Sequence, residues 1–423
     1  MPHVPIERHA LDNGLRVTLS PDRRAPIVAV NLWYDVGSKH EKPGKTGFAH
    51  LFEHMMFQGS ANVAKTEHFA LIQGVGGTLN ASTWLDRTNY FATLPSHELE
   101  LALWLEADRL GGLLPAMTQE KLDNQRDVVK NERRFSVDNQ PYGDWDERMQ
   151  AAIYPEGHPY HHPTIGSMED LSAASLDDVA SFFAAHYAPN NAVLTIAGDF
   201  DPWAALEMVG RHFGPIPANA EMPPDPDMAV AASLGGEARQ IVPDRVPLPR
   251  IYAAWRMPTF GTGAFDALEV AGDVLGTGRG SRLYGSLVRE QRLAQDVSVF
   301  AFPLVGGASM FALWATARPA VEVDRLETAL FGEIDRLGTA GPSDAELERA
   351  RNLHASAVES ALERLSERAD RLSMYACLFD DPERINAEVS RYAMVSAQRV
   401  ADAVRTTLVP DNRVVITYLP EGG

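Results

Sequence analysis

The sequence contains a single cysteine, Cys377, among its 423 residues. One thiol excludes an internal disulfide and excludes a metal site built from several sulfur ligands. The sequence also has no run of 18 or more apolar residues, so it predicts no membrane-spanning helix. Any metal ligands of this chain must therefore be nitrogen or oxygen atoms.

Basic residues are scarce relative to acidic ones: 38 Lys and Arg stand against 57 Asp and Glu, giving a net charge of -19. This balance argues against nucleic acid and anionic membranes as partners and is compatible with substrates that carry positive charge. The first residues, Met1 to Glu7, lack the basic start and the apolar run of a secretory leader. We therefore expect a cytoplasmic protein, or a periplasmic one if a leader was removed before this chain was made.

The length is too great for one compact core and predicts two domains. A proline-dense stretch, residues 215–236, predicts a linker between an N-terminal domain (1–214) and a C-terminal domain (237–423). The second half repeats the strand, loop and helix order of the first, with a strand at 250–255 and a helix at 264–275. Strand and helix patterns occur in both halves, so the sequence predicts an α+β fold of two homologous domains. Each domain is expected to be a mostly antiparallel sheet covered by helices.

The most informative stretch is residues 49–57, where His50 and His54 are four residues apart among apolar helix formers. On a helix this spacing puts both imidazoles on one face, one turn apart, as two ligands of one metal ion require. Glu53 lies on the shoulder of that face, where its carboxylate can contact a water beside the metal. The order His-x-x-Glu-His is the inverse of the commoner His-Glu-x-x-His zinc signature. The alternative to a metal site is a hydrogen-bonded polar cluster in the core.

A second helix is predicted over residues 118–139, and Glu132 falls on its inward stripe with Leu122, Gln125, Val128 and Val129. An inward-facing carboxylate needs a cation, and a metal on the two histidines would supply it. Gln125 lies two turns earlier and is suited to a hydrogen bond that supports a ligand. Two alternatives remain open for Glu132, a salt bridge to a neighbouring arginine and simple solvent exposure.

A glycine-rich loop at 74–77 opens into a strand through residue 84, followed by a second strand at 87–94. If the first strand is a sheet edge, the small residues Ala81 and Ser82 would let a peptide backbone approach it. A plain hairpin inside a sheet fits the residues equally well. A later loop, residues 154–171, carries His158, His161 and His162 among turn residues, and we interpret these as loop histidines rather than as metal ligands.

These motifs together resemble the pitrilysin, insulinase and mitochondrial processing peptidase family of inverted zinc peptidases, in its short-subunit bacterial type. The resemblance rests on His50 to His54, on residues 126–132, 77–90 and 154–160, and on the duplicated second half, and so covers nearly the whole chain. It implies one half of a clamshell around a chamber in which unfolded peptides are cut.

Residue by residue, the resemblance implies one Zn²⁺ per chain on His50, His54 and Glu132. Glu53 would be the general base for peptide bond hydrolysis, and Asn80 and Ala81 would pair with the substrate backbone. Laying Gly276 over Gly59 places apolar residues opposite the motif in the second half, which predicts a framework there without the metal: Ala267, Val270 and Ala271.

The chain departs from the family pattern at two places. Gln125 stands where a glutamate is usual, and Val288 and Gln295 stand where the second domain usually carries an arginine and a tyrosine that contact the substrate carbonyl. Arg289 is one residue out of register. We therefore expect a homologous subunit to supply the missing pair in a heterodimer, with a homodimer or a chain active alone as alternatives. The alternative to a peptidase is a non-catalytic subunit that binds peptides or takes part in assembly.

Overall fold

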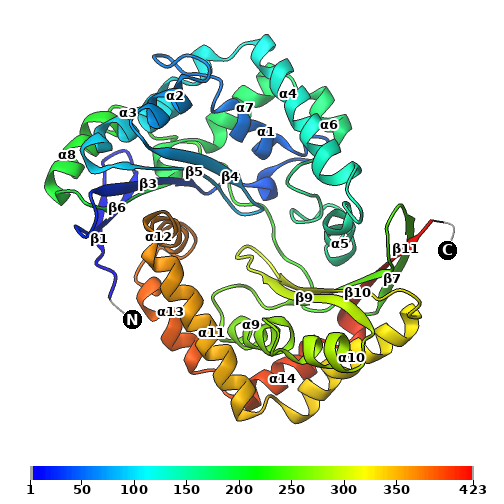
Figure 1. Cartoon of the computed structure of the whole chain (residues 1–423). Coiled ribbons are helices and arrows are strands. Elements are labelled where there is room, and N and C mark those ends of the chain that lie inside the picture. The colour runs from blue at the N-terminus through cyan, green and yellow to red at the C-terminus, as the bar shows by residue number, and fades with distance from the viewer. Residues whose placement is uncertain (1–2, 422–423) are drawn as a thin grey trace. The chain divides into compact units, whose positions relative to one another are not determined.

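The computed structural model describes residues 3–421 and divides the chain into two compact units, each assembled from three stretches of sequence. The first unit contains the residues up to Arg133, His162–Pro226 and Val358–Ala387. The second contains Arg134–His161, Asp227–Ala357 and the residues from Glu388 onward. Each unit has one β-sheet with packed helices, which confirms the predicted α+β fold (Figure 1).

The first unit contains a six-stranded sheet in the order β1-β2-β6-β3-β5-β4. All neighbouring strands are antiparallel except β2 and β6. The strands are β1 (Glu7–Ala10), β2 (Arg16–Pro21), β3 (Ile27–Tyr34), β4 (Thr78–Thr83), β5 (Thr88–Pro95) and β6 (Ala192–Gly198). The helices are α1 (Phe48–Met55), α2 (Glu67–Gly74), α3 (Leu99–Gly112), α4 (Gln119–Arg133), α6 (Met168–Ala173), α7 (Leu176–His186), α8 (Pro202–Phe213) and α12 (Leu365–Phe379).

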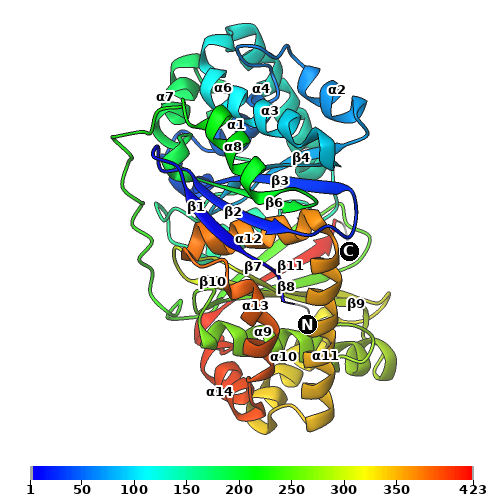
Figure 2. The same ribbon diagram turned by 90° about the vertical axis from the view of Figure 1, so that its left-hand side faces the viewer.

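Helices cover both faces of this sheet, which explains why its central strands are almost wholly apolar. On one face, the main core joins the inward residues of β3 to α1 and α3. On the other face, α12 places Ala369 and Ala376 against Ala29 and Trp33 of β3, so that a helix from late in the sequence completes the unit (Figure 2). This packing holds β4 at the sheet edge beside α1.

The second unit contains a five-stranded sheet in the order β7-β11-β8-β10-β9, in which only β7 and β11 are parallel. Its face carries α5, whose Trp145 stacks on Tyr252 of β8 with ring centroids 5.0 Å apart. The strands are β7 (Ala238–Asp244), β8 (Arg250–Met257), β9 (Ala294–Phe302), β10 (Ser309–Ala317) and β11 (Arg413–Pro420). The helices are α5 (Trp145–Ile153), α9 (Gly263–Gly276), α10 (Val323–Ala340) and α14 (Ala397–Thr407), while the unit boundaries fall within α11 (Asp344–Glu363) and α13 (Arg384–Ala393).

Two predicted helices end differently from expectation. Residues 343–378 contain no glycine or proline and predict one helix, but the structure has two, α11 and α12, because Arg364 adopts an extended conformation with φ −86° and ψ 122°. The helix expected to continue to residue 139 ends as α4 at Arg133 and continues as a π-helical turn, Arg134–Asp138. In both cases no glycine or proline marks the change.

The predicted linker, residues 215–236, contains no helix or strand. The compact units do not follow one cut at this linker, because α5 and α12 each pack on a sheet formed mainly by the other half of the sequence. The domain limits of 1–214 and 237–423 therefore remain a prediction. In the described part of the chain, every helix is too short or too polar to cross a membrane.

Candidate metal centre

Helix α1 buries one face and leaves its motif residues half-buried on the other. Leu51, Phe52 and Met55 are at most 1% exposed and pack into the core of the first unit. Because residues three and four apart share a helix face, this burial directs His50 and His54 to the opposite side. The core therefore fixes the orientation of the two imidazoles.

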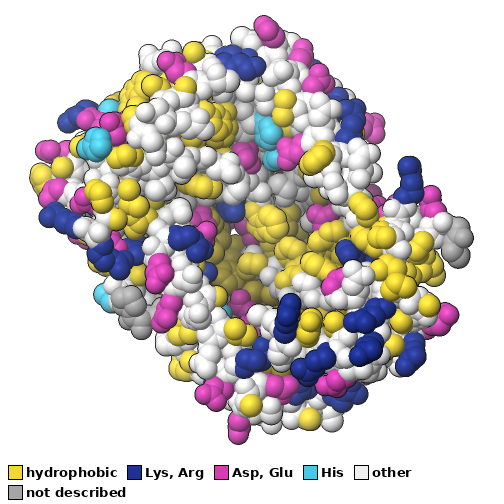
Figure 3. All heavy atoms as spheres, viewed as in Figure 1, with side chains coloured by type: hydrophobic (Ala, Val, Ile, Leu, Met, Phe, Trp, Pro, Cys, Tyr) yellow, Lys and Arg dark blue, Asp and Glu magenta, His cyan; other side chains and the backbone are white. Residues whose placement is uncertain are grey.

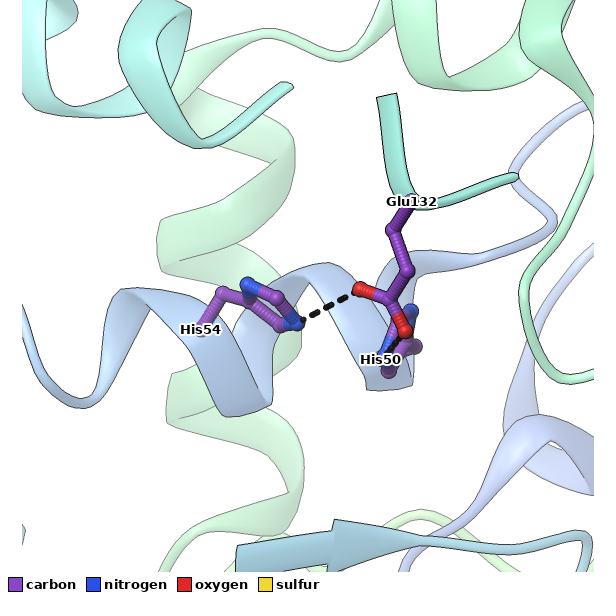
Figure 4. Close-up of side chains that lie close together, drawn as sticks. All are labelled: His50, His54 and Glu132. Carbon is purple, nitrogen blue, oxygen red and sulfur yellow. Dashed lines mark ion pairs between the residues drawn. The ribbon is translucent and has the colours of Figure 1, made fainter. Parts of the chain in front are cut away.

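The structure brings Glu132 of α4 to both histidines, although about 80 residues separate them in sequence (Figure 4). Nε2 of His54 lies 3.4 Å from one Glu132 carboxylate oxygen, and Nε2 of His50 lies 3.7 Å from the other. The imidazole centroids are 4.8 Å apart. The potential ligand atoms of the three residues all lie within 4.8 Å of one another, which is the span of a single ion's coordination shell.

The charges of the three groups are linked. Burial, and after it the charge of the neighbouring His54, lower the pKa of His50 to about 4 against the opposing charge of Glu132. Burial also acts to lower the pKa of His54, but the hydrogen bond and charge of Glu132 outweigh it, so that this pKa is raised. The hydrogen bond from His54 lowers the pKa of Glu132. Of the two imidazoles, His54 is therefore the one whose protonation the neighbouring Glu132 favours.

Glu132 is more exposed than the sequence predicts. Leu122, Gln125 and Val129 of α4 are buried, but Val128 is 41% exposed and the Glu132 side chain is 42% exposed. The side of α4 that is buried at Leu122 and Gln125 is thus exposed at Glu132, just before the helix continues as the π-helical turn. Histidine and acidic side chains are visible together on the surface over α1 and α4 (Figure 3). A bound ion would therefore keep an open position toward solvent.

Glu53 does not belong to the three-residue cluster but lies beside it. The Thr83 hydroxyl at the end of β4 donates a hydrogen bond of 2.5 Å to Oε2 of Glu53. Burial raises the pKa of Glu53, while Thr83, His54 and Arg87 act to lower it. A carboxylate with a raised pKa is a better proton acceptor near neutral pH than an exposed one. Thr83 was not singled out by the sequence, where it looks like any strand residue.

Gln125 is 6% exposed, and its hydrogen bond with His54 is among the interactions that raise the pKa of that histidine. Its amide nitrogen donates to Asn124 at 3.1 Å. Gln125 therefore lies where the sequence placed it, next to a ligand candidate.

Strand β4 is an edge of its sheet and also forms an antiparallel hairpin with β5, so the edge condition is met while a plain hairpin still describes residues 78–95. Asn80 pairs with Phe91 of β5 and Ala81 with Tyr90. Asn80 is exposed, whereas Ala81 is 8% exposed and belongs to the core. The free side of β4 offers backbone groups to an added strand.

The loop histidines contact protein groups other than a metal cluster. His158 contacts the carbonyl of Met228 at 3.3 Å, and His161 contacts that of Tyr154 at 2.8 Å. His162 contacts the carboxylate of Glu41 at 2.9 Å. Among the described residues, His50, His54 and Glu132 form the only group of three or more such side chains placed to hold a metal. Two imidazole nitrogens and a carboxylate are a donor set that zinc accepts in catalytic sites, so these residues fit the implied ion.

In the second unit, Ala267, Val270 and Ala271 of α9 are at most 2% exposed and contribute to its core. Val288 is 7% exposed within a π-helical turn, Tyr284–Glu290, and Gln295 is exposed on β9. Arg289 is exposed and lies 3.3 Å from Glu290. The two positions that the resemblance aligns with the family's arginine and tyrosine thus carry a buried aliphatic side chain and an exposed amide.

Two family models match the chain. Residues 16–162 match the model described as Insulinase (Peptidase family M16), and residues 173–353 match the Peptidase M16 inactive domain. Among curated proteins, Zinc protease PqqE of Helicobacter pylori is 29% identical over 421 residues, covering 95% of this chain and 92% of that protein. A probable mitochondrial-processing peptidase subunit beta of Arabidopsis thaliana is 26% identical, covering 81% of this chain and 65% of that protein.

Solved structures agree with these relatives. The crystal structure of a protease from Helicobacter pylori superposes with a TM-score of 0.92 at 26% identity and covers 99% of this chain and 100% of that one. The first half of the periplasmic protease PqqL from Escherichia coli shares the fold at 18% identity, with a TM-score of 0.79, 99% of this chain and 93% of that one. The chain belongs to the pitrilysin, insulinase and mitochondrial processing peptidase family of inverted zinc peptidases (peptidase family M16), in its short bacterial type.

Proposed function

We propose that this chain is a subunit of a zinc metalloendopeptidase that hydrolyses peptides or unfolded polypeptide segments. The observation that carries the proposal is the convergence of His50, His54 and Glu132 from two helices, with Glu53 beside them next to an edge strand. His50, His54 and Glu132 bind one Zn²⁺ per chain, and Glu53 is the general base.

A bound zinc ion supplies Lewis-acid chemistry, polarising oxygen atoms that reach its open position. The chain's own residues do the rest. Glu53 takes a proton from the attacking water, and its raised pKa suits that exchange near neutral pH. Thr83 occupies Oε2 of Glu53, so Oε1 is the atom that we expect to receive the proton. The same carboxyl group then returns the proton to the leaving amine.

Peptide substrates are expected to bind along β4 as an added strand. Backbone hydrogen bonds to the free side of residues 80 and 81 would hold an extended peptide regardless of its side chains. Asn80 is exposed at this position, and Ala81 adds no bulky side chain to the edge strand. The net charge of −19 favours peptides that carry positive charge.

The proposal includes a homologous partner subunit in a heterodimer. Val288 is buried and aliphatic and Gln295 carries no positive charge, so these two positions provide no cationic donor for the developing charge on the substrate carbonyl. Such a donor typically contributes about 3 kcal/mol to catalysis. A homologous chain that carries the arginine and tyrosine would supply it. If the chain cleaves peptides alone or as a homodimer, a homologous partner subunit is not required.

A non-catalytic peptide-binding or assembly role is the second candidate. It is favoured by the match of residues 173–353 to the inactive-domain model and by a 24% identical relative, the human cytochrome b-c1 complex subunit 1. The first unit contains all three candidate zinc ligands and the candidate base Glu53, which favours the peptidase instead.

The test measures zinc content and the cleavage of a quenched peptide by the purified chain, alone and with a homologous chain that carries the arginine and tyrosine. We expect one zinc per chain and cleavage that a chelator abolishes and zinc restores. Glu53→Gln is the matched variant, because it should keep the zinc and lose the cleavage. Zinc binding without cleavage under any pairing would favour the non-catalytic role, and absence of zinc would refute the peptidase.

A further inference from the structure

Helix α1 begins without a capping side chain of its own. Its N-cap residue is Gly47, with φ 84°, which offers no side-chain acceptor to the first backbone N–H groups. Helix starts usually satisfy these groups with Ser, Thr, Asp or Asn at this position. The acceptor comes instead from Glu41, six residues earlier.

The Glu41 carboxylate accepts from two N–H groups at this helix start. The N–H of Gly47 lies 2.8 Å from Oε2, and that of Ala49 lies 2.7 Å from Oε1. His162 contacts Oε2 from the other side at 2.9 Å, and the Glu41 side chain is fully buried. A buried carboxylate with three such contacts fixes the start of α1 to the segment that carries His162.

The same segment makes further contacts with the start of α1. The backbone and hydroxyl of Thr46 donate to Asp170 at 2.9 and 2.6 Å. Gly166 lies so close to Gly47 that an added Cβ at residue 166 would be 2.3 Å from the Gly47 Cα. The glycine at 166 is therefore needed for this approach as well as for its φ of 73°.

The segment also contacts α4, which carries Glu132. Arg133, the next residue, donates to the carbonyl of Gly166 at 3.0 Å. Arg126 donates to the carbonyls of Ser172 at 2.9 Å and Ala174 at 3.2 Å. Residues 162–174, which we call the clamp segment, thus bind both the helix of the two histidines and the helix of the glutamate.

We propose that Glu41 and the clamp segment are positioning elements that set the separation of α1 and α4, and thereby the affinity and geometry of the metal site. None of these residues would touch the ion. They act through the backbone of α1 and through Arg133, since the two helices that must converge on one ion are joined by the same short segment. This inference rests on the proposed zinc site.

The test compares zinc dissociation constants, measured by competition with a chromophoric chelator, for the native chain, Glu41→Ala, Glu41→Gln and Gly166→Ala. Loss of groups that support metal ligands typically weakens affinity about 10- to 100-fold. We expect that loss for Glu41→Ala and Gly166→Ala, and a smaller one for Glu41→Gln, which keeps one acceptor oxygen. The absorption spectrum of the cobalt-substituted protein should change in the same order.

Asp201→Ala is the matched control. It removes the capping side chain of α8, which accepts from Ala204 at 3.0 Å, in the same unit but away from the site. We expect it to lower the melting temperature of the metal-free protein while zinc affinity stays within twofold of native. Circular dichroism of the metal-free variants checks that each is folded at the temperature of the titration.

Native-like zinc affinity and cobalt spectra in Glu41→Gln and Gly166→Ala would overturn the inference while leaving the proposed function intact. Equal weakening in Asp201→Ala would also overturn it, because the effect would then follow general stability. A native chain that binds no zinc would overturn both proposals.

Discussion

Thr83 gives the sharpest prediction about catalysis, because its hydroxyl is the group that holds the proposed base. Thr83→Val keeps the β-branched shape at the end of β4 and removes the 2.5 Å hydrogen bond to Glu53. A hydrogen bond to a charged group contributes about 1.5–3 kcal/mol, and each ~1.4 kcal/mol corresponds to tenfold in rate. Since Glu53 is only partly buried, water can replace part of this interaction, and we expect kcat/KM on the acidic side of the pH profile, where more of the base becomes protonated, to fall about tenfold.

The pH dependence identifies the cause. Thr83 donates to the ionised form of Glu53 and so acts to lower its pKa. Without that donor the pKa rises further above its ordinary value, and a base that must be ionised loses activity at a higher pH. The acidic limb of the kcat/KM profile should therefore move to higher pH in Thr83→Val, while zinc content stays at the native level.

The assay is cleavage of a quenched peptide across pH 5 to 9, with Thr83→Ser as the matched control. Serine restores the hydroxyl, so it should recover most of the native rate and the native profile. A Thr83→Val enzyme within twofold of native and with an unmoved acidic limb would refute the assigned role of this hydrogen bond. A Thr83→Ser enzyme as slow as Thr83→Val would point to packing instead.

Three further predictions concern the metal site and its support. Glu132 raises the pKa of His54, so Glu132→Gln should lower the His54 pKa that NMR measures in the metal-free protein. The same variant should weaken zinc binding at least tenfold. Zinc competes with protons for imidazole, so the affinity for zinc should fall about tenfold per pH unit below the raised pKa of His54. The fall should become steeper only near pH 4, where His50 also takes up a proton. Titrations at several pH values check this slope, and a flat dependence from pH 7 to 5 would contradict it. Phe52→Ala should destabilise the protein by about 3–5 kcal/mol, because the ring is 1% exposed in the core behind the site, and thermal or chemical unfolding measures the loss.

Much of the site could be predicted because local periodicity carries its geometry. The four-residue spacing of His50 and His54 and their apolar neighbours predicted a helix with two imidazoles on one face, as α1 has. The stripe of Leu122, Gln125 and Val129 likewise placed Glu132 on the correct side of its helix. Its exposure was not predicted, because periodicity gives the direction of a side chain and not the distance to the next packed element.

The remaining features depend on contacts between distant segments. Arg364 breaks a continuous helical pattern without a glycine or proline, because packing of α12 on the first sheet outweighs local propensity. Glu41 looks like an ordinary loop residue, and the only local signal of its role is Gly47, which leaves α1 without a capping side chain. Thr83 has no local signal, since its meaning comes from the approach of β4 to α1.

The central claim is that one zinc ion is bound by two residues of α1 and one of α4. The most direct measurement is a crystal structure of the zinc-loaded chain with anomalous diffraction data on both sides of the zinc absorption edge. The account predicts a single strong peak at about 2.0–2.2 Å from Nε2 of His50, Nε2 of His54 and a carboxylate oxygen of Glu132. A peak elsewhere, or none in crystals grown with excess zinc, would contradict it.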